Sequence, residues 1–353
     1  MKPLYVVGTS GSGKTATCLG LIQKFMEKGL KVSYFKPVGN VGDSRGREDE
    51  DAKLMKHVLD MDAPLDKITP FTLTFDYLDK YPKENAADYM DTVVGCYAEV
   101  SEGSDLVVME GTTNTQAMIS LGLGASDIAA KLNAKILVIG MVKNDFRLDN
   151  LLMQNEYMMD KGADIVGTVF NFVPPDITDK TINTYVPILE ERGSRVLGVV
   201  PESKELTSPT VQEVYDILGG ELLVGEDRMG LLVKTILIGA MNVDSALEYF
   251  KKSPEKAVIT GGDRTDVALA ALDTDTSALI LTGDLHPDHR VLEKAKEKSI
   301  PTILVPHDTY STVEKLHYMS RKIKPEDERS LKLTKELVGE YIDWEAVLQD
   351  LPS

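Results

Sequence analysis

The segment Gly8-Thr9-Ser10-Gly11-Ser12-Gly13-Lys14-Thr15 decides the fold class of this chain, because it matches the pattern G-x4-G-K-S/T. It lies between an apolar run, residues 4–7, that predicts a strand and an amphipathic stretch, residues 16–28, that predicts a helix. Glycines let the backbone curl so that its N–H groups point at an anion, and the helix adds the positive end of its dipole. This context favours a phosphate-binding loop over an ordinary Gly-rich turn.

The residue types of this loop predict an ATP site with Mg²⁺. Lys14 would neutralise the terminal phosphates, and the Thr15 hydroxyl has the position from which such loops ligate Mg²⁺. The residues expected to contact the nucleotide here are Gly8, Ser10, Gly11, Ser12, Gly13, Lys14, Thr15 and Ala16.

The composition restricts the class of partner. The chain has 353 residues, enough for two domains, and a formal net charge of −17. This charge disfavours binding to nucleic acid or to anionic membranes. No run approaches the roughly 18 apolar residues of a membrane span, the chain enters a strand without a leader, and Cys18 and Cys96 fit no metal spacing. We therefore expect a cytoplasmic protein with two free thiols.

Apolar runs alternate with helix-period stretches through the first part of the chain, as is typical of a parallel sheet with helices on both faces. The runs span residues 4–7, 31–35, 106–109, 136–141, 166–172 and 195–200. With the loop, they predict an α/β fold of the P-loop nucleoside triphosphatase type over residues 1–210. Ligands of such sheets bind beyond the carboxyl ends of the strands.

A second, smaller α/β domain is predicted for residues 211–353, with Gly219-Gly220 at the junction. Residues 327–348 favour one or two helices, which would form a C-terminal helical tail of this domain. Its expected strands span residues 235–238, 257–259, 278–281 and 302–305, and its expected helices lie around residues 245–250, 266–272 and 291–298.

Polar residues follow several predicted strands of the first domain. Glu110 comes directly after residues 106–109 and before Gly111, so it is a candidate carboxylate for Mg²⁺, or alternatively a helix cap. Lys36 follows the second strand and would bring a cation to the same edge, unless it is simply solvated. Asn171 comes directly after residues 166–170 of the fifth run, where its amide could read the edge of a purine.

A run of acidic residues, Glu48-Asp49-Glu50-Asp51, opens a predicted helix that ends near Leu59. Acidic residues at a helix start interact favourably with the helix dipole, so this run could be purely structural. The alternative is a role in binding metal.

In the second domain, Gly261, Gly262, Asp263, Arg264 and Thr265 end one strand and open a helix. Glycines, a helix N-terminus and an arginine together predict an anion site. The alternative is a turn that only reverses the chain and caps the helix.

The first 200 or so residues resemble dethiobiotin synthetase and the related ATPases that make cobyrinic acid diamide. The matching residues are the phosphate loop, Lys36-Pro37, Asp51-Ala52, Glu110-Gly111 and Asn171. The resemblance implies that Thr15, Asp51 and Glu110 hold Mg²⁺ and that Asn171 reads adenine. It further implies that Lys36, acting with Lys14, faces an acyl substrate and the transferred phosphate. A diaminopelargonate-binding set is not identified, so biotin synthesis is not expected.

Residues from about 218 to 318 resemble the DRTGG domain, most clearly at Gly261-Gly262-Asp263-Arg264-Thr265-Asp266. The order of the two domains resembles the N-terminal half of long phosphotransacetylases. Because the chain ends at Ser353, the catalytic phosphotransacetylase domain and acetyl transfer are not expected. In regulated pyrophosphatases such domains pair across a dimer and bind adenine nucleotides, which implies a homodimer with a regulatory role here.

Two functional hypotheses follow, and the sequence leaves them open. The first is a nucleotide-sensing protein, linked to acyl-phosphate metabolism, that acts on a partner metabolic enzyme. The second is an ATP-dependent ligase that activates a carboxylate or carbamate as a mixed phosphate anhydride. A scaffold that has lost its ligand is disfavoured, because Lys14, Thr15, Asp51 and Glu110 are all present.

Overall fold

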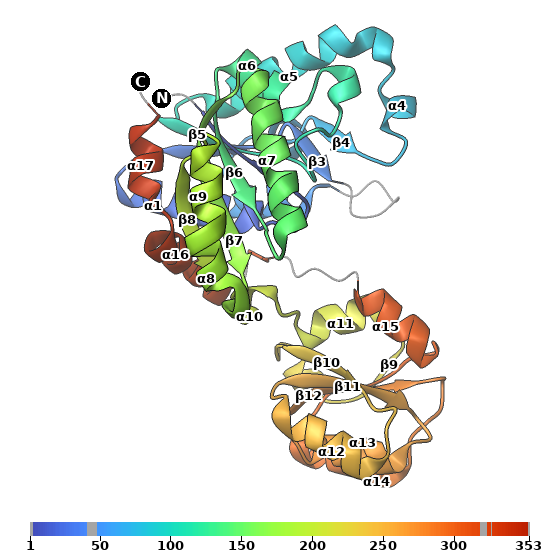
Figure 1. Ribbon diagram of the computed structural model, residues 1–353. Coiled ribbons are helices and arrows are strands. Elements are labelled where there is room, and N and C mark those ends of the chain that lie inside the picture. Colours follow the sequence, from blue (N-terminus) through green and yellow to red (C-terminus); the bar gives the residue numbers. More distant parts are fainter. Residues whose placement is uncertain (1–2, 41–47, 318–322, 326, 352–353) are drawn as a thin grey trace. The chain divides into compact units, whose positions relative to one another are not determined.

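The computed structural model describes residues 3–40, 48–317, 323–325 and 327–351 (Figure 1). The chain forms two compact units, one of residues 1–202 with 323–353 and the other of residues 203–322. Each unit is an α/β sheet with helices, so the predicted fold class is confirmed. Within the described part of the chain, no helix combines the length and the apolar character that crossing a membrane requires.

The first unit is built on a six-stranded sheet in the order β2-β5-β1-β6-β7-β8. All five neighbouring pairs run parallel, so the carboxyl ends of the strands meet at one edge. Each expected strand of this domain forms, with bounds β1 Leu4–Gly8, β2 Val32–Phe35, β5 Leu106–Glu110, β6 Lys135–Gly140, β7 Asp164–Val173 and β8 Val196–Pro201. A separate parallel pair consists of β3 (Val38–Asn40) and β4 (Phe71–Leu73).

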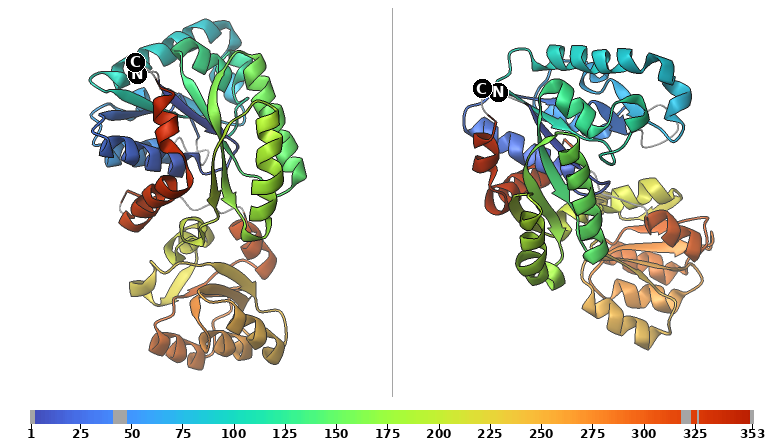
Figure 2. Two further views of the ribbon diagram at one scale, coloured as in Figure 1. Left: turned by 60° about the vertical axis from the view of Figure 1, so that its left-hand side comes forward. Right: turned by 45° about the horizontal axis from the view of Figure 1, so that its top comes forward.

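Helices cover both faces of this sheet. Figure 2 shows α1, α16 and α17 on one side and α7 with α9 on the other. The bounds are α1 Lys14–Glu27, α2 Glu50–Val58, α3 Leu65–Ile68, α4 Tyr77–Lys80, α5 Ala86–Ser101, α6 Ala125–Leu132, α7 Asp145–Asp160, α8 Thr178–Lys180, α9 Val186–Glu191, α16 Glu328–Tyr341 and α17 Trp344–Gln349. Cys18 on α1 and Cys96 on α5 are buried free thiols, as expected.

The C-terminal helices correct one part of the domain prediction. We expected the tail to belong to the second domain, but residues 323–353 group with the first unit. Helix α16 packs on α1, where Gly20 allows a close approach: a Cβ on Gly20 would lie 2.4 Å from Cγ2 of Val338. Helical periodicity identifies the apolar face of α16, but it cannot say which distant helix covers that face.

The second unit has a five-stranded sheet in the order β10-β11-β12-β13-β9, in which only β9 is antiparallel to its neighbour. The strands are β9 Glu221–Val224, β10 Thr235–Ile238, β11 Lys256–Gly261, β12 Thr276–Thr282 and β13 Thr302–Leu304, and the helices are α10 Lys204–Thr207, α11 Val211–Leu218, α12 Val243–Lys252, α13 Thr265–Leu272, α14 His289–Lys298 and α15 Thr309–His317. Strand β9 was not predicted. Gly219-Gly220 is the turn that leads into it from α11, so this pair lies inside the second unit and not at a junction.

Candidate functional site

The phosphate-binding loop is preformed at the carboxyl end of β1. Gly11 and Gly13 have φ of 71° and 85°, a left-handed conformation that glycine adopts without strain. Gly13 precedes α1, whose first turn has no side-chain cap, so its backbone N–H groups remain available to an anion. The Lys14 ammonium donates to the Thr9 carbonyl at 2.9 Å and closes the loop. Burial lowers the pKa of Lys14.

Glu110 lies beside this loop, as the sequence predicted. The Thr15 hydroxyl donates to Glu110 Oε1 at 2.8 Å, and the Tyr34 hydroxyl donates to Oε2 at 2.7 Å. Glu110 is only 1% exposed, and burial raises its pKa. Tyr34 was missed, although strand alternation carries a signal: Tyr34 and Lys36 are two residues apart, which places their side chains on one face.

Lys36 is fully buried, so its interpretation as a solvated lysine is wrong. Its Nζ lies 2.5 Å from Asp51 Oδ2, 3.1 Å from Asp49 Oδ2 and 3.5 Å from Glu110 Oε1. Burial alone would lower the pKa of Lys36, but the carboxylates of Glu110, Asp51 and Asp49 outweigh it and raise the pKa. One cation among three carboxylates leaves an excess of negative charge in this cluster.

Asp49 has two roles at this position. Its side chain caps α2 by accepting from the Ala52 N–H at 2.9 Å, which is the structural role considered for the acidic run. The same carboxylate pairs with Lys36, a contact that the sequence analysis missed. The site therefore includes both a helix cap and an ion-pair cluster.

The oxygen atoms of Thr15 and Glu110 suit Mg²⁺, which prefers hard oxygen ligands and uses one or two carboxylates together with phosphate oxygens. Among the residues that the structure describes, no group of three or more His, Cys, Asp or Glu is placed to hold a metal by itself. Asp51, the other predicted metal ligand, has a carboxylate oxygen on Lys36. An Mg²⁺ ion here would therefore depend on the phosphates of a nucleotide for its remaining ligands, and Asp51 as a ligand stays a prediction.

Asn171, the residue expected to read adenine, also lies at the loop. Its Nδ2 donates to the Ser12 carbonyl at 2.8 Å, across 159 residues of sequence. The neighbouring Phe172 lies against the same loop and was not predicted, because its position depends on a backbone irregularity without a local sequence signal. The Ser12 hydroxyl is buried without a partner in the described structure.

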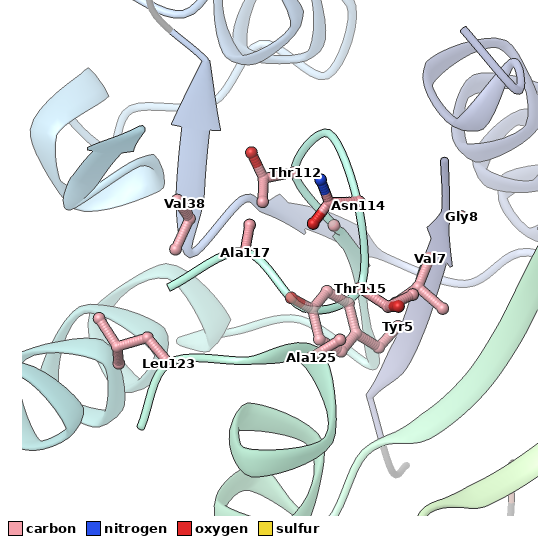
Figure 3. Close-up of a pocket in the computed structure, with 11 residues that line it drawn as sticks. Tyr5, Val7, Gly8, Val38, Thr112, Asn114, Thr115, Ala117, Leu123 and Ala125 are labelled. Atoms are coloured by element: carbon pink, nitrogen blue, oxygen red, sulfur yellow. The ribbon is translucent and has the colours of Figure 1, made fainter. Parts of the chain in front are cut away.

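A small cavity lies beside the start of the loop, at the ends of β1 and β5 (Figure 3). Its volume of about 10 Å³ is roughly the room that one water molecule needs. It is lined by Tyr5, Val7, Gly8, Val38, Gly111, Thr112, Asn114, Thr115, Ala117, Leu123 and Ala125. The Oδ1 atom of Asn114 is buried with no partner among the described residues, whereas the Thr112 hydroxyl donates to Asn40 Oδ1 at 2.7 Å.

In the second unit, the predicted anion-binding residues Gly261 to Thr265 form a tight turn between β11 and α13. Arg264 donates from Nη2 to the Met241 carbonyl at 2.9 Å, and its Nε lies 3.5 Å from Asp266 Oδ1. A Cβ on Gly262 would lie 1.7 Å from the Leu285 carbonyl oxygen, so only glycine fits there. These contacts within the chain account for the arginine and the glycine at positions 264 and 262. The anion site stays a prediction.

A wide groove of about 770 Å³ in the second unit lies away from this turn, beside β9 and the end of α14. Its polar lining includes Gln212, Glu226, Asp227 and Lys296. The sequence analysis did not identify it.

Comparison with known proteins agrees with this architecture. The family model for an AAA domain matches residues 2–210, and the model for a DRTGG domain matches residues 213–319. The phosphate acetyltransferase of Nitratidesulfovibrio vulgaris is 29% identical over 96% of this chain and 50% of its own length. That of Nitrosomonas europaea is 24% identical over 99% of this chain and 52% of its own length. The chain thus spans about half the length of the curated relatives it matches.

Solved structures give weaker similarity. The CBS and DRTGG domains of Clostridium perfringens pyrophosphatase, complexed with diadenosine tetraphosphate, are 20% identical, with a TM-score of 0.29 over 48% of this chain and 85% of that chain. An ATP complex of a variant of McdA from Cyanothece is 16% identical, with a TM-score of 0.37 over 58% of this chain and 84% of that chain. The match of residues 2–210 covers more than half of the chain, and the protein therefore belongs to the AAA domain family of P-loop proteins, with a DRTGG domain after the P-loop domain.

Proposed function

We propose that this protein is a nucleotide sensor that binds MgATP at the phosphate-binding loop of the first unit and an adenine nucleotide at the DRTGG unit. The observation that carries the proposal is the convergence of Lys14, Thr15, Glu110 and Asn171 on one preformed loop. Lys14 neutralises the terminal phosphates, Thr15 and Glu110 hold Mg²⁺, and Asn171 contacts the adenine.

The buried ion pairs of Lys36 favour sensing over rapid turnover. A cation that contributes to phosphoryl transfer must face the charge that develops on the transferred group. Lys36 instead lies within 3.5 Å of Asp49, Asp51 and Glu110, and its charge is already balanced by these carboxylates. Moving it toward a substrate would take the cation away from the buried carboxylates of Asp49 and Glu110, which is costly.

The second candidate is an ATP-dependent ligase acting on a carboxylate or carbamate. The cavity beside the loop favours it, because the unpartnered Asn114 Oδ1 could accept a hydrogen bond from a second ligand. In this candidate Lys36 changes partners and faces the acyl phosphate. Substrate-stimulated release of phosphate distinguishes it from a sensor.

Pairing of two DRTGG units is the proposed route to a homodimer. Four apolar side chains are exposed at the ends of strands of the second sheet, in the loops that follow, or at the start of α15, namely those of Ile238, Met241, Leu285 and Tyr310. Met241 and Leu285 both contact the turn at Gly262 to Arg264 through their carbonyl oxygens. Burial of this edge against a second copy would remove apolar surface from water and would couple the turn to the dimer.

The curated relatives, which are phosphate acetyltransferases about twice as long, support a role in acyl-phosphate metabolism. In this role, nucleotide occupancy biases a dimer that acts on an acetyl-transferring partner or domain. Calorimetric titration of MgATP together with an assay of phosphate release tests the proposal. Tight binding with negligible turnover is expected, and steady turnover stimulated by an acid would favour the ligase.

A further inference from the structure

The end of β7 contains a β-bulge at the phosphate-binding loop. Phe170 pairs with Val199 of β8 and Val173 pairs with Pro201, so Asn171 and Phe172 together stand opposite the single residue Val200. Phe172 has a φ of 54°, a left-handed conformation that is strained for an aromatic residue. Bulges occur beside active sites, where they redirect a side chain.

The bulge directs two consecutive side chains at one glycine. A Cβ on Gly13 would lie 2.2 Å from Asn171 Nδ2 and 2.9 Å from Cε2 of the Phe172 ring. In a regular strand, consecutive side chains point to opposite faces. The bulge therefore allows both side chains to contact the start of α1.

The hydrogen bond from Asn171 fixes the orientation of its carboxamide. The Ser12 carbonyl can only accept, so the amide nitrogen must face the loop and Oδ1 must face away from it. The described residues donate no hydrogen bond to this Oδ1. An acceptor in this position matches the amino group of adenine and opposes the carbonyl oxygen that guanine has at the same ring position.

We propose that Phe172 is a positioning residue for base selection. Its ring, held against Gly13 by the bulge, keeps the Asn171 side chain in the place from which it bonds the Ser12 carbonyl, and this hydrogen bond turns the acceptor end toward the base, so that the site selects adenine over guanine nucleotides. The inference rests on the proposed nucleotide binding and adds to it a determinant that does not touch the phosphates.

Two substitutions distinguish the effect of the Phe172 ring from the effect of the backbone conformation at this position. Phe172→Gly removes the ring but adopts a φ of 54° without strain, whereas Phe172→Tyr keeps both the ring and the bulge. The full-length wild type and both variants are titrated by calorimetry with MgATP, MgGTP and inorganic tripolyphosphate. Tripolyphosphate reports the phosphate loop alone.

The wild type is expected to prefer ATP over GTP by about tenfold or more, since a mismatched hydrogen-bonding group is strongly rejected. Phe172→Gly should reduce this preference to about threefold or less and leave tripolyphosphate affinity within about twofold. Phe172→Tyr should keep the wild-type preference. The inference is overturned by equal affinity of the wild type for ATP and GTP, by an unchanged preference in Phe172→Gly, or by an equal loss of all three ligands in that variant. A wild type that binds none of the three ligands would overturn the proposed function itself.

Discussion

The Thr15 hydroxyl donates a hydrogen bond of 2.8 Å to Oε1 of Glu110, joining the first turn of α1 to the end of β5 across 95 residues of sequence. Both oxygen atoms belong to groups that ligate Mg²⁺ in phosphate sites. The contact brings together two residues that were predicted separately, one from a loop motif and one from its place after a strand.

Substituting Glu110 tests the metal site. Glu110→Gln keeps the shape of the side chain and one acceptor oxygen for either Thr15 or Tyr34, but it removes the charge. We expect ATP affinity in the presence of Mg²⁺ to fall by about tenfold or more, to the value measured with EDTA. Calorimetry with and without Mg²⁺ measures this, with the exposed Glu102→Gln as the control. An unchanged Mg²⁺ dependence of ATP binding would show that Glu110 does not hold the metal ion.

The proposed dimer is tested at one of the exposed apolar side chains of the second unit. Tyr310, 76% exposed, is expected to be buried against a second copy, so Tyr310→Asp should convert the dimer to a monomer. Light scattering at several concentrations gives the mass. Phe146→Asp, at an exposed residue of the first unit, is the matched control and should leave the mass unchanged. A wild type that is monomeric at all concentrations would contradict the dimer.

The packing of α16 on α1 leads to a stability prediction. A side chain at position 20 would meet Val338 and the Thr334 carbonyl at 2.4 and 2.7 Å, so Gly20→Ala should destabilise the first unit by about 1–3 kcal/mol. Gly95→Ala on α5 is the control, because nothing lies within 4 Å of its added Cβ and alanine favours a helix by about 1 kcal/mol. Denaturant unfolding measures both. Equal stability of Gly20→Ala and the wild type would contradict the packing.

The sheet of the first unit could be predicted from the sequence because its buried strands are continuous apolar runs such as residues 106–109 and 136–141. Strand β9 could not, because it is a short, half-exposed edge strand that follows directly on Gly219-Gly220. The location of α16 also escaped prediction, since an amphipathic face specifies that it is covered but not by which element.

A pH prediction follows from Lys256, which is fully buried at the start of β11 and donates to the Asp275 carbonyl at 2.7 Å. Burial lowers its pKa from 10.5 to about 8. Between these values the unfolded chain binds more protons than the folded chain, so stability rises with pH in this range.

Relative to Lys256→Met, the wild type should therefore gain about 2 kcal/mol between pH 7 and pH 10. Unfolding at several pH values measures the difference, and an NMR titration of the lysine side chain, assigned with the variant, gives the pKa. The exposed Lys298→Met should show no such change. A titration midpoint near the ordinary value of 10.5 would contradict the prediction.

For the candidate site, as for the fold, some residues could be predicted from the sequence and others could not. Lys14, Thr15, Glu110 and Asn171 could be found because motif and strand ends place them at one edge of a parallel sheet. Phe172 could not be found, because its contact with the loop depends on a bulge and a positive φ that only the folded pairing of β7 with β8 imposes.

The most direct test of nucleotide sensing is calorimetric titration of ATP, ADP and AMP into the full chain with Mg²⁺, with phosphate release followed on the same sample. We predict two binding events with negligible turnover. Lys14→Ala should abolish the triphosphate event at the loop, and Arg264→Ala should weaken only the second event. A single event with steady hydrolysis, or triphosphate binding that survives Lys14→Ala, would contradict the account.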